Sequence, residues 1–265
     1  MNYAGQVSVD DKHHVITGAC ASSAGNRDSQ NLAEILGQAI ENLSKESIKI
    51  EEVVADAGYS SGEALAYCEE NNIDAYIPNF GQYKAEREGF KYNKEKDQYE
   101  CQRGNRAILP FKKIATDSKG YTKRIYRTDN SKCKDCPLRG KCIGKSDFKK
   151  IEDSIDKPYY DRMYEKLTKK KAYAKRLIKI RSKTVEPVLG TLLNYMNLRR
   201  VNTRGMSGAN KHVLFSALSY NLKKYINFIK RKSQSNVQAM LKPQTEWQIT
   251  KNFLLQGYTT SLDLI

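Results

Sequence analysis

Histidine is scarce in this sequence, and several features that would define a function class are absent. Only 3 histidines occur among 265 residues, and none is paired with a plausible serine or cysteine nucleophile, so no catalytic triad is indicated. The sequence has no phosphate-binding P-loop and no GxGxxG motif, which leaves nucleotide hydrolysis and dinucleotide binding unsupported. No apolar run reaches membrane-spanning length, and no charged-then-apolar leader opens the chain. These absences argue against a membrane span and against secretion.

Charge of one sign, in contrast, is abundant. The chain has 46 Lys and Arg against 30 Asp and Glu, a net charge of +16 and a pI near 9.4. Eight basic residues and no acid fall between Lys169 and Lys183. A surplus of this size is typical of proteins that bind a polyanion, and it favours nucleic acid over an anionic membrane.

The cysteine spacing suggests metal ligation. Without an export signal the 6 cysteines are expected to be reduced, so disulfides are not favoured. A CxxC pair, Cys133 and Cys136, is followed by Cys142, and Cys101 precedes the pair. We predict one structural Zn²⁺ per chain held by these four thiolates, with four unrelated thiols as the alternative. Cys20 and Cys68 have the character of ordinary core residues.

Hydrophobic periodicity divides the chain into four segments of an α/β protein. Residues 1–79 begin with a strand hairpin and an amphipathic helix. Residues 80–150 predict a β-rich insertion with hairpins around "NKEKDQ" and "TDSKG" and the cysteine cluster. Residues 151–232 are expected to be helical, with breaks at Pro187 and within 202–210 and a last helix over 211–232. We expect residues 233–265 to form a poorly ordered tail.

A strand–helix–strand unit is predicted over residues 53–79, "VVADAGYSSGEALAYCEENNIDAYIPN". Such a unit implies a parallel strand pair with a right-handed crossover. Ser60 and Glu63 fit a capping box at the start of the helix. The first strand ends at Asp56, where a carboxylate can bind a divalent metal if other acids converge on it. The alternative role of Asp56 is to cap the turn that follows.

Glu186 is the second candidate acid. It is the only acid in "KIRSKTVEPVLGTLLNYMNLRR", residues 179–200. Pro187 is typical of the first turn of a helix, so we expect Glu186 at or just before a helix start. The helix dipole alone favours an acid there, whereas an acid in a basic groove also suits metal-dependent phosphodiester chemistry.

Five segments, taken in order, resemble the carboxyl-terminal catalytic half of bacterial insertion-sequence DDE transposases. The resemblance extends from Asn2 to Ile229. The segments are "YAGQVSVD", "ADAGYSSGEALAYCEENNIDAYIPN", "CKDCPLRGKC", "RSKTVEPVLGTL" and "RRVNTRG" with "ANKHVLFSALSYNLKKY".

The resemblance implies a ribonuclease H-like fold in which a central mixed sheet carries three acids that bind two Mg²⁺ or Mn²⁺ ions. In this fold residues 1–79 would form the first part of the catalytic core, and residues 151–232 the helical second part. By matching motifs, Asp56 in "ADAGY" is the second acid and Glu186 in "VEP" is the third. The metals activate water or a 3′-hydroxyl against a DNA phosphodiester, which cuts the ends of the element and then joins them to the target. The family implies double-stranded DNA as substrate, a homodimer or larger complex as the active form, and work at the nucleoid in the bacterial cytoplasm.

DNA contacts are expected from the basic stretches near Glu186. Arg181 is expected to support contact with phosphate, and we predict mostly phosphate contacts and therefore weak sequence specificity and steep salt dependence. The predicted DNA-binding residues are Lys175, Arg176, Lys179, Arg181, Lys183, Arg199, Arg200 and Arg204.

The sequence departs from the family pattern at two points. The first acid is expected on a strand that precedes Asn2, and Asp10 and Asp11 lie in the following hairpin and are poor substitutes. We therefore expect this chain alone to be inactive, since two-metal chemistry needs the full set of acids. Leu193 stands where family members often have a basic residue, which removes one expected DNA contact.

Two other interpretations stay open. The chain is a non-catalytic DNA-binding remnant if substitution of Asp56 and Glu186 leaves its function unchanged. It is a metal-dependent nuclease on the same fold if it cuts DNA without joining the ends.

Overall fold

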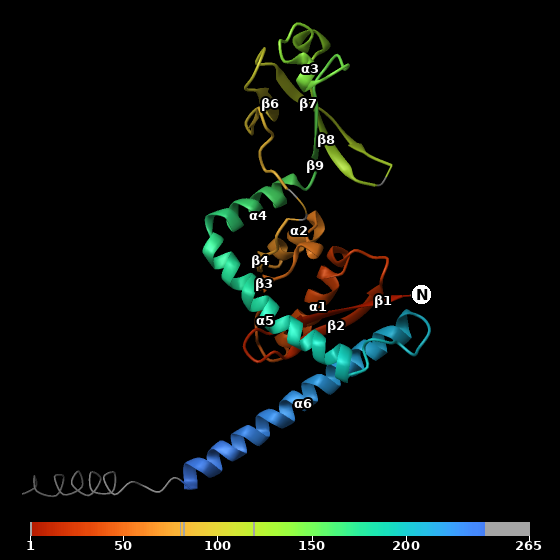
Figure 1. Ribbon diagram of the computed structural model, residues 1–265, viewed down its shortest axis with the longest axis vertical. Coiled ribbons are helices and arrows are strands. Elements are labelled where there is room, and N and C mark those ends of the chain that lie inside the picture. Colours follow the sequence, from red (N-terminus) through yellow and green to blue (C-terminus); the bar gives the residue numbers. More distant parts are fainter. Residues whose placement is uncertain (1, 80, 82, 119, 242–265) are drawn as a thin grey trace, which may run out of the picture.

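The computed structural model describes residues 2–79, 81, 83–118 and 120–241. Figure 1 shows an elongated molecule with three regions along its length. A β-rich subdomain lies at one end, an α/β core lies in the middle, and the long helix α6 runs outward from the core at the other end. The mixed α/β composition agrees with the expected fold class.

The chain begins with an antiparallel hairpin that is covered by helices. Strands β1 (Tyr3–Val9) and β2 (Ile16–Ser23) pair along their length. After the short turn η1 (Asp28–Gln30), helix α1 (Leu32–Ser44) packs on β2. The inward residues of α1, Leu32 and Leu36, join a second core cluster with Ala64 and Leu65. This order of elements matches the hairpin and helix predicted from the sequence.

The predicted strand–helix–strand unit is present. Strand β3 (Glu52–Val54) pairs in parallel with β4 (Asp74–Tyr76), and α2 (Gly62–Glu70) connects them after the turn η2 (Ala57–Tyr59). The predicted capping box was wrong by one residue, because Ser61 and not Ser60 accepts the hydrogen bond from the Ala64 amide, at 3.1 Å. Ser60 instead ends the turn that begins at Asp56.

The insertion folds as one five-stranded antiparallel sheet. Its strands follow one another in sequence order, with β5 and β6 forming the first predicted hairpin and β7 and β8 the second. Its small core contains Tyr99, Leu109, Tyr126 and Ile151. The strands are β5 (Phe90–Asn93), β6 (Gln98–Cys101), β7 (Ile108–Thr116), β8 (Thr122–Arg127) and β9 (Lys150–Ser154), with η3 (Asn130–Cys133) and α3 (Arg139–Cys142) between β8 and β9.

Among the residues that the structure describes, three helices follow the insertion: α4 (Lys157–Lys169), α5 (Lys171–Tyr195) and α6 (Met206–Leu241). The break predicted at Pro187 was wrong, since Pro187 lies inside α5. Buried residues on both sides of the proline, Leu177 and Val188 among them, pack into core clusters and hold the helix continuous. The predicted tail is helical as far as Leu241, and the rest of it, residues 242–265, lies outside the described residues.

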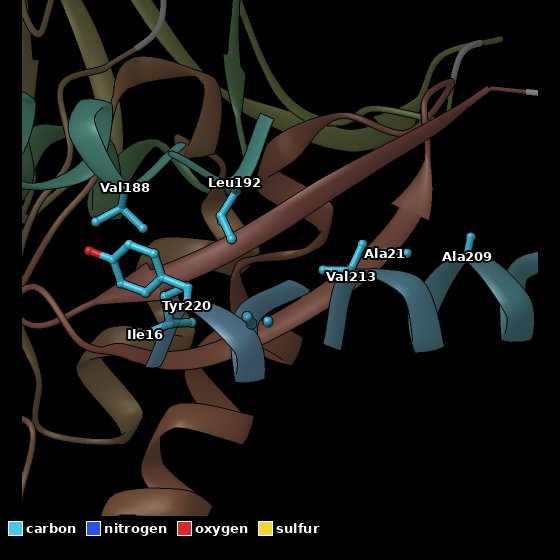
Figure 2. Close-up of a cluster of buried hydrophobic side chains, with 9 residues drawn as sticks. Ile16, Ala21, Val188, Leu192, Ala209, Val213 and Tyr220 are labelled. Atoms are coloured by element: carbon cyan, nitrogen blue, oxygen red, sulfur yellow. The ribbon is translucent and has the colours of Figure 1, made fainter. Parts of the chain in front are cut away.

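One core cluster joins the amino-terminal hairpin to the helices at the other end of the described chain. Figure 2 shows Ile16 of β2 by Tyr220 of α6 and near Val188 of α5, and it shows Ala21 of β2 beside Val213 of α6. Two asparagines of α6 also bind the β2 backbone. The side chain of Asn221 bonds both the amide and the carbonyl of Ile16, and Asn210 accepts from the Ala21 amide at 2.9 Å. These bonds cover the outer edge of β2, which has no strand partner there among the described residues.

The described strands form three separate sheets. The pairs β1–β2 and β3–β4 are each two-stranded, and only the insertion has a larger sheet. Within the described part of the chain, a single central mixed sheet of the kind expected is therefore not formed. The hairpin of β1 and β2 and the parallel pair are connected by packing of α1 and α2 rather than by a strand ladder.

Candidate functional site

Asp56 lies at the carboxyl end of β3, as predicted, and it also caps the turn that follows. Its Oδ1 accepts a hydrogen bond from the Gly58 amide at 3.0 Å. The carboxylate remains 49% exposed. Asp56 therefore performs the local capping role and still presents its second oxygen outward from the end of the strand.

Arg181 supplies the partner of that second oxygen. Its Nη1 lies 3.5 Å from Asp56 Oδ2, across 125 residues of sequence. The contact forms because Arg181 follows Leu177 by one helical turn and so shares the face of α5 that packs toward the core. The structure thus brings one residue of the basic stretch to the candidate acid.

A second acid, Asp28, lies beside Asp56. A Cβ atom built on Gly58 would lie 3.0 Å from Asp56 Oδ1 and 3.1 Å from Asp28 Oδ2, so glycine is what allows both carboxylates to approach this turn. The buried side chain of Gln6 donates from Nε2 to Asp28 Oδ1 at 3.0 Å. The Tyr59 hydroxyl donates to the Oε1 of the same glutamine. Burial, and then the charges of Asp28 and Asp56, raise the pKa of Tyr59.

Sequence reasoning missed Asp28, Gln6 and Tyr59 as members of this group. Asp28 follows β2 in sequence, and η1 places it near η2 through a contact that local sequence does not encode. The one available signal was the Asp-x-Gly order after β3, because a glycine in such a turn permits close approach of a neighbouring group.

Glu186 does not join this group. The residue is exposed, and it lies five positions after Arg181 on α5. Five residues turn the side-chain direction of a helix by about 140°, so Glu186 and Arg181 point to different sides of α5. The expected position at a helix start was wrong, since Glu186 lies in the interior of α5.

The acids therefore do not form a metal site as they stand. Over the described residues, no three His, Cys, Asp or Glu side chains are grouped closely enough to hold a metal ion. The arrangement fits one acid neutralised by an arginine, and it does not fit a three-acid site for two Mg²⁺ ions.

The predicted DNA-binding residues form a mostly exposed basic surface. Lys175, Arg176, Lys179 and Lys183 are exposed along α5, and none of the four forms an ion pair with a described residue. In the connection from α5 to α6, Arg199, Arg200 and Arg204 are also exposed, and Arg199 donates to the Asn194 side chain at 2.8 Å. Arg181 is the exception, because its side chain is only 22% exposed and is paired with Asp56.

Four cysteines gather at a second location. Cys101, Cys133, Cys136 and Cys142 all line one small cavity of about 30 Å³ in the insertion. They are not arranged as a ligand set. The Sγ of Cys101 lies 2.6 Å from the Arg103 carbonyl oxygen, and the Sγ of Cys133 lies 3.5 Å from the Thr128 hydroxyl. The donor chemistry suits zinc, but the thiols would have to turn toward one another to bind it.

The other two cysteines lie in the core. Cys20 and Cys68 are buried, and burial raises the pKa of each thiol to about 11. Their burial agrees with the prediction that they are packing residues.

A family model described as "Transposase DDE domain" matches residues 100–226. The matched segment begins at the end of β6 and ends within α6, so it includes Glu186 and the basic residues of α5 and leaves Asp56 outside. No curated protein and no solved structure matches the chain. None of the helices that the structure describes is long and apolar enough to cross a membrane.

Proposed function

We propose that this chain is a DDE transposase and acts in the cutting and joining of DNA when an insertion sequence moves, and the family match over residues 100–226 supports this proposal. The observation that carries the proposal beyond the family match is the contact of Arg181 with Asp56. It joins the basic face of α5, which suits a DNA backbone, to the acid that family motifs assign to catalysis.

The basic face of α5 would hold double-stranded DNA by its phosphates. Lys175, Arg176 and Lys179 follow each other at helical spacing and are exposed, so they can contact successive phosphates of one strand. Arg199, Arg200 and Arg204 extend this charge beyond the end of α5. Contacts of this kind orient a duplex but carry little sequence information.

We further propose that the intact enzyme has a ribonuclease H-like sheet of which this chain holds two parts. Strands β1 and β3 each pair on one side only among the described residues, which leaves both with an edge that an added strand can pair with. In this proposal the added strand brings the first acid, and it lies outside residues 1–265.

Mg²⁺ or Mn²⁺ would, when bound, supply activation of the attacking oxygen and stabilise charge on the phosphate. Asp56 and Glu186 are the acids that we assign to this task, but Glu186 lies on a different side of α5 from Arg181, the residue that contacts Asp56. As long as no metal is bound, Arg181 holds Asp56 in place and partly neutralises its charge. We therefore propose that residues 1–265 alone bind DNA and do not transfer strands.

A strand-transfer assay on paired element ends tests this function. We expect the purified chain to bind the duplex and to yield no joined product with Mg²⁺ or Mn²⁺, and Asp56→Ala, which frees Arg181, should bind the duplex at least as tightly. Joined product from the chain alone would contradict the incomplete site, and cleavage without joining would favour a nuclease. Activity that appears when an upstream strand bearing an aspartate is added would support the transposase, whereas DNA binding that never leads to chemistry would favour a non-catalytic remnant.

We also propose a structural Zn²⁺ in the insertion, held by Cys101, Cys133, Cys136 and Cys142. The supporting observation is that all four line one cavity although up to 41 positions of sequence separate them. Elemental analysis of protein purified without chelator should find one zinc per chain. Cys133→Ser and Cys136→Ser should abolish it, and Cys68→Ser, in the core, should not. Absence of zinc from the unaltered protein would contradict this proposal.

A further inference from the structure

Helix α6 is apolar on two opposite faces. One face carries Ala209, Val213, Ala217 and Tyr220, which are buried against β2 and α5. The opposite face carries large apolar side chains that remain exposed. A helix that is apolar on both sides normally has partners on both sides.

The exposed face has the spacing of a coiled coil. Its central residues are separated alternately by three and four positions, which keeps them in one line along the helix. We call this line the seam. It consists of Phe215, Leu218, Leu222, Tyr225 and Ile229, with exposed fractions between 43% and 67%.

The positions that flank the seam carry no charge. In a coiled coil the flanking positions select the partner by attraction or repulsion of charges. Here Lys211 and Lys232 bound the seam at its two ends, and no charged residue lies on its flanks between them. The flanking residues are Leu214, Ser219, Asn221, Ile226 and Phe228.

This charge pattern indicates what the seam can bind. An acidic helix would find no basic row beside the seam to pair with. A second copy of this chain would meet no like-charge repulsion along the seam, in spite of the net charge of +16. The lysines of this part of α6 lie to the side, and Lys224 is turned back to donate to the His13 carbonyl at 2.7 Å.

We propose that the seam is a self-association surface, on which α6 of one protomer packs against α6 of a second copy. Beyond Tyr220 the helix runs outward from the core, so two such helices can meet without collision of the bodies (Figure 1). Two-fold pairing needs only that one surface be complementary to itself, as an uncharged apolar seam is. The inference deepens the proposal of an enzyme that works on paired DNA ends, but the association requires neither DNA nor catalysis.

The test is the mass of the full chain by light scattering and sedimentation over a range of protein concentrations. We expect a dimer of twice 30.2 kDa for the unaltered chain. Leu218→Glu with Leu222→Glu should give 30.2 kDa at all concentrations. Both leucines are more than half exposed, so the monomer should keep its circular dichroism and melting temperature. If the pair does not fold, Tyr225→Glu tests the same surface.

The matched control is Lys223→Gln with Lys230→Gln, which changes the net charge by the same amount at positions of α6 outside the seam and its flanks, and it should leave the dimer intact. A second test mixes Leu222→Glu protein with Leu222→Lys protein, each monomeric alone. Recovery of a dimer in the mixture would show direct contact between two copies. An unaltered chain that stays monomeric, or a dimer that survives both glutamates, would overturn the proposal and would mean that another segment or another protein covers the seam. Because the measurement is made without DNA, its failure is distinct from failure of the proposed function.

Discussion

Arg181 Nη1 lies 3.5 Å from Asp56 Oδ2, so a cation from the middle of α5 is paired with the acid at the end of β3. Both groups belong to regions that would meet DNA, and each changes what the other can do. While the pair is intact, Asp56 repels a DNA phosphate less strongly than an unpaired carboxylate would, and Arg181 attracts a phosphate less strongly than an unpaired arginine would. A substitution of either residue should therefore change DNA affinity more than it changes the stability of the fold.

Substitution of Arg181 by Gln is expected to weaken DNA binding and to alter stability little. The pair is partly exposed, so its loss should change the free energy of unfolding by at most about 1 kcal/mol. Loss of one phosphate contact should reduce the slope of log affinity against log salt by about 1. Fluorescence anisotropy over a salt series and urea unfolding provide the two readouts. Asp56→Asn is the complementary variant, and a loss of affinity in it would contradict this account because it frees Arg181.

Removal of charge from the exposed face of α5 should have a larger effect on the same slope. Replacing Lys175, Arg176, Lys179 and Lys183 by Gln should reduce the magnitude of the slope by about 3 to 4, since each neutralised phosphate of B-DNA contributes about 0.9. The control removes the same charge from the insertion by replacing Lys91, Lys94, Lys96 and Lys113, which are exposed there. If the two sets of substitutions reduce the slope equally, DNA binding depends on the net charge of the protein and not on a defined surface of α5.

Neighbouring leucines of α5 should differ sharply in their contribution to stability. Leu192 is 1% exposed in the main core, and Leu192→Ala should cost about 2–5 kcal/mol of unfolding free energy. Leu193 is 39% exposed, and Leu193→Ala should cost less than about 1 kcal/mol. Urea unfolding of both variants measures the difference. Similar costs would indicate that α5 is rotated about its axis relative to the described packing.

Alanine at Gly58 should disturb the group around Asp56. The added methyl would lie 3.0–3.1 Å from the carboxylates of Asp56 and Asp28, so one or both must move. We expect the Asp56–Arg181 pair to loosen. DNA affinity should then rise, as we expect for Asp56→Asn, because Arg181 is freed to contact phosphate. Gly190→Ala is a fitting control, because a methyl there meets nothing within 4 Å. If Gly58→Ala and Gly190→Ala bind DNA with the same affinity, the backbone of the turn must accommodate the methyl group without movement of Asp56 and Asp28.

Thiol labelling should separate the cysteines by burial. Cys142 is exposed and should react first in the folded protein, whereas Cys20 and Cys68 should react only after unfolding. Their thiol pKa is raised from 9.0 to about 11, so the folded state favours the protonated form. Their contribution to stability is therefore complete below pH 9 and is lost as the pH rises toward 11. Mass spectrometry after timed alkylation follows each site, and early labelling of Cys68 at neutral pH would contradict its burial.

Local pattern predicted the local elements well. The strand–helix–strand unit at Asp56 and both hairpins of the insertion follow from alternation, turn residues and helical periodicity, which act over a few residues. Pro187 misled the prediction because the rule for proline is also local. The burial of Val188 and Leu192 after it depends on β2 and α6, and the burial of Leu177 before it depends on β3 and β4. No window of sequence near Pro187 contains that information.

The site was less predictable than the fold. Asp56 could be identified because it ends a strand, but its neighbours Asp28, Gln6 and Arg181 come from three other elements, 22 to 175 positions apart from one another. Their convergence depends on how η1, η2 and α5 pack. Glu186 shows the reverse case, since its motif was recognised while the side of the helix on which it lies could not be derived from the motif.

The contact of Asn221 with Ile16 joins residues 205 positions apart, and this affects how the protein can be made. At about 5–20 residues per second, the ribosome reaches Asn221 roughly 10–40 s after it has passed Ile16. During that interval the hairpin of β1 and β2 has emerged without the helix that covers it, and its apolar face is open to chaperones or to other nascent chains. A stop codon between α5 and Tyr220 would make that exposure permanent, whereas one after residue 232 would not. A gene that gradually loses codons from its 3′ end should therefore still encode a protein that can fold, as long as the loss does not extend into the part of α6 that covers β2.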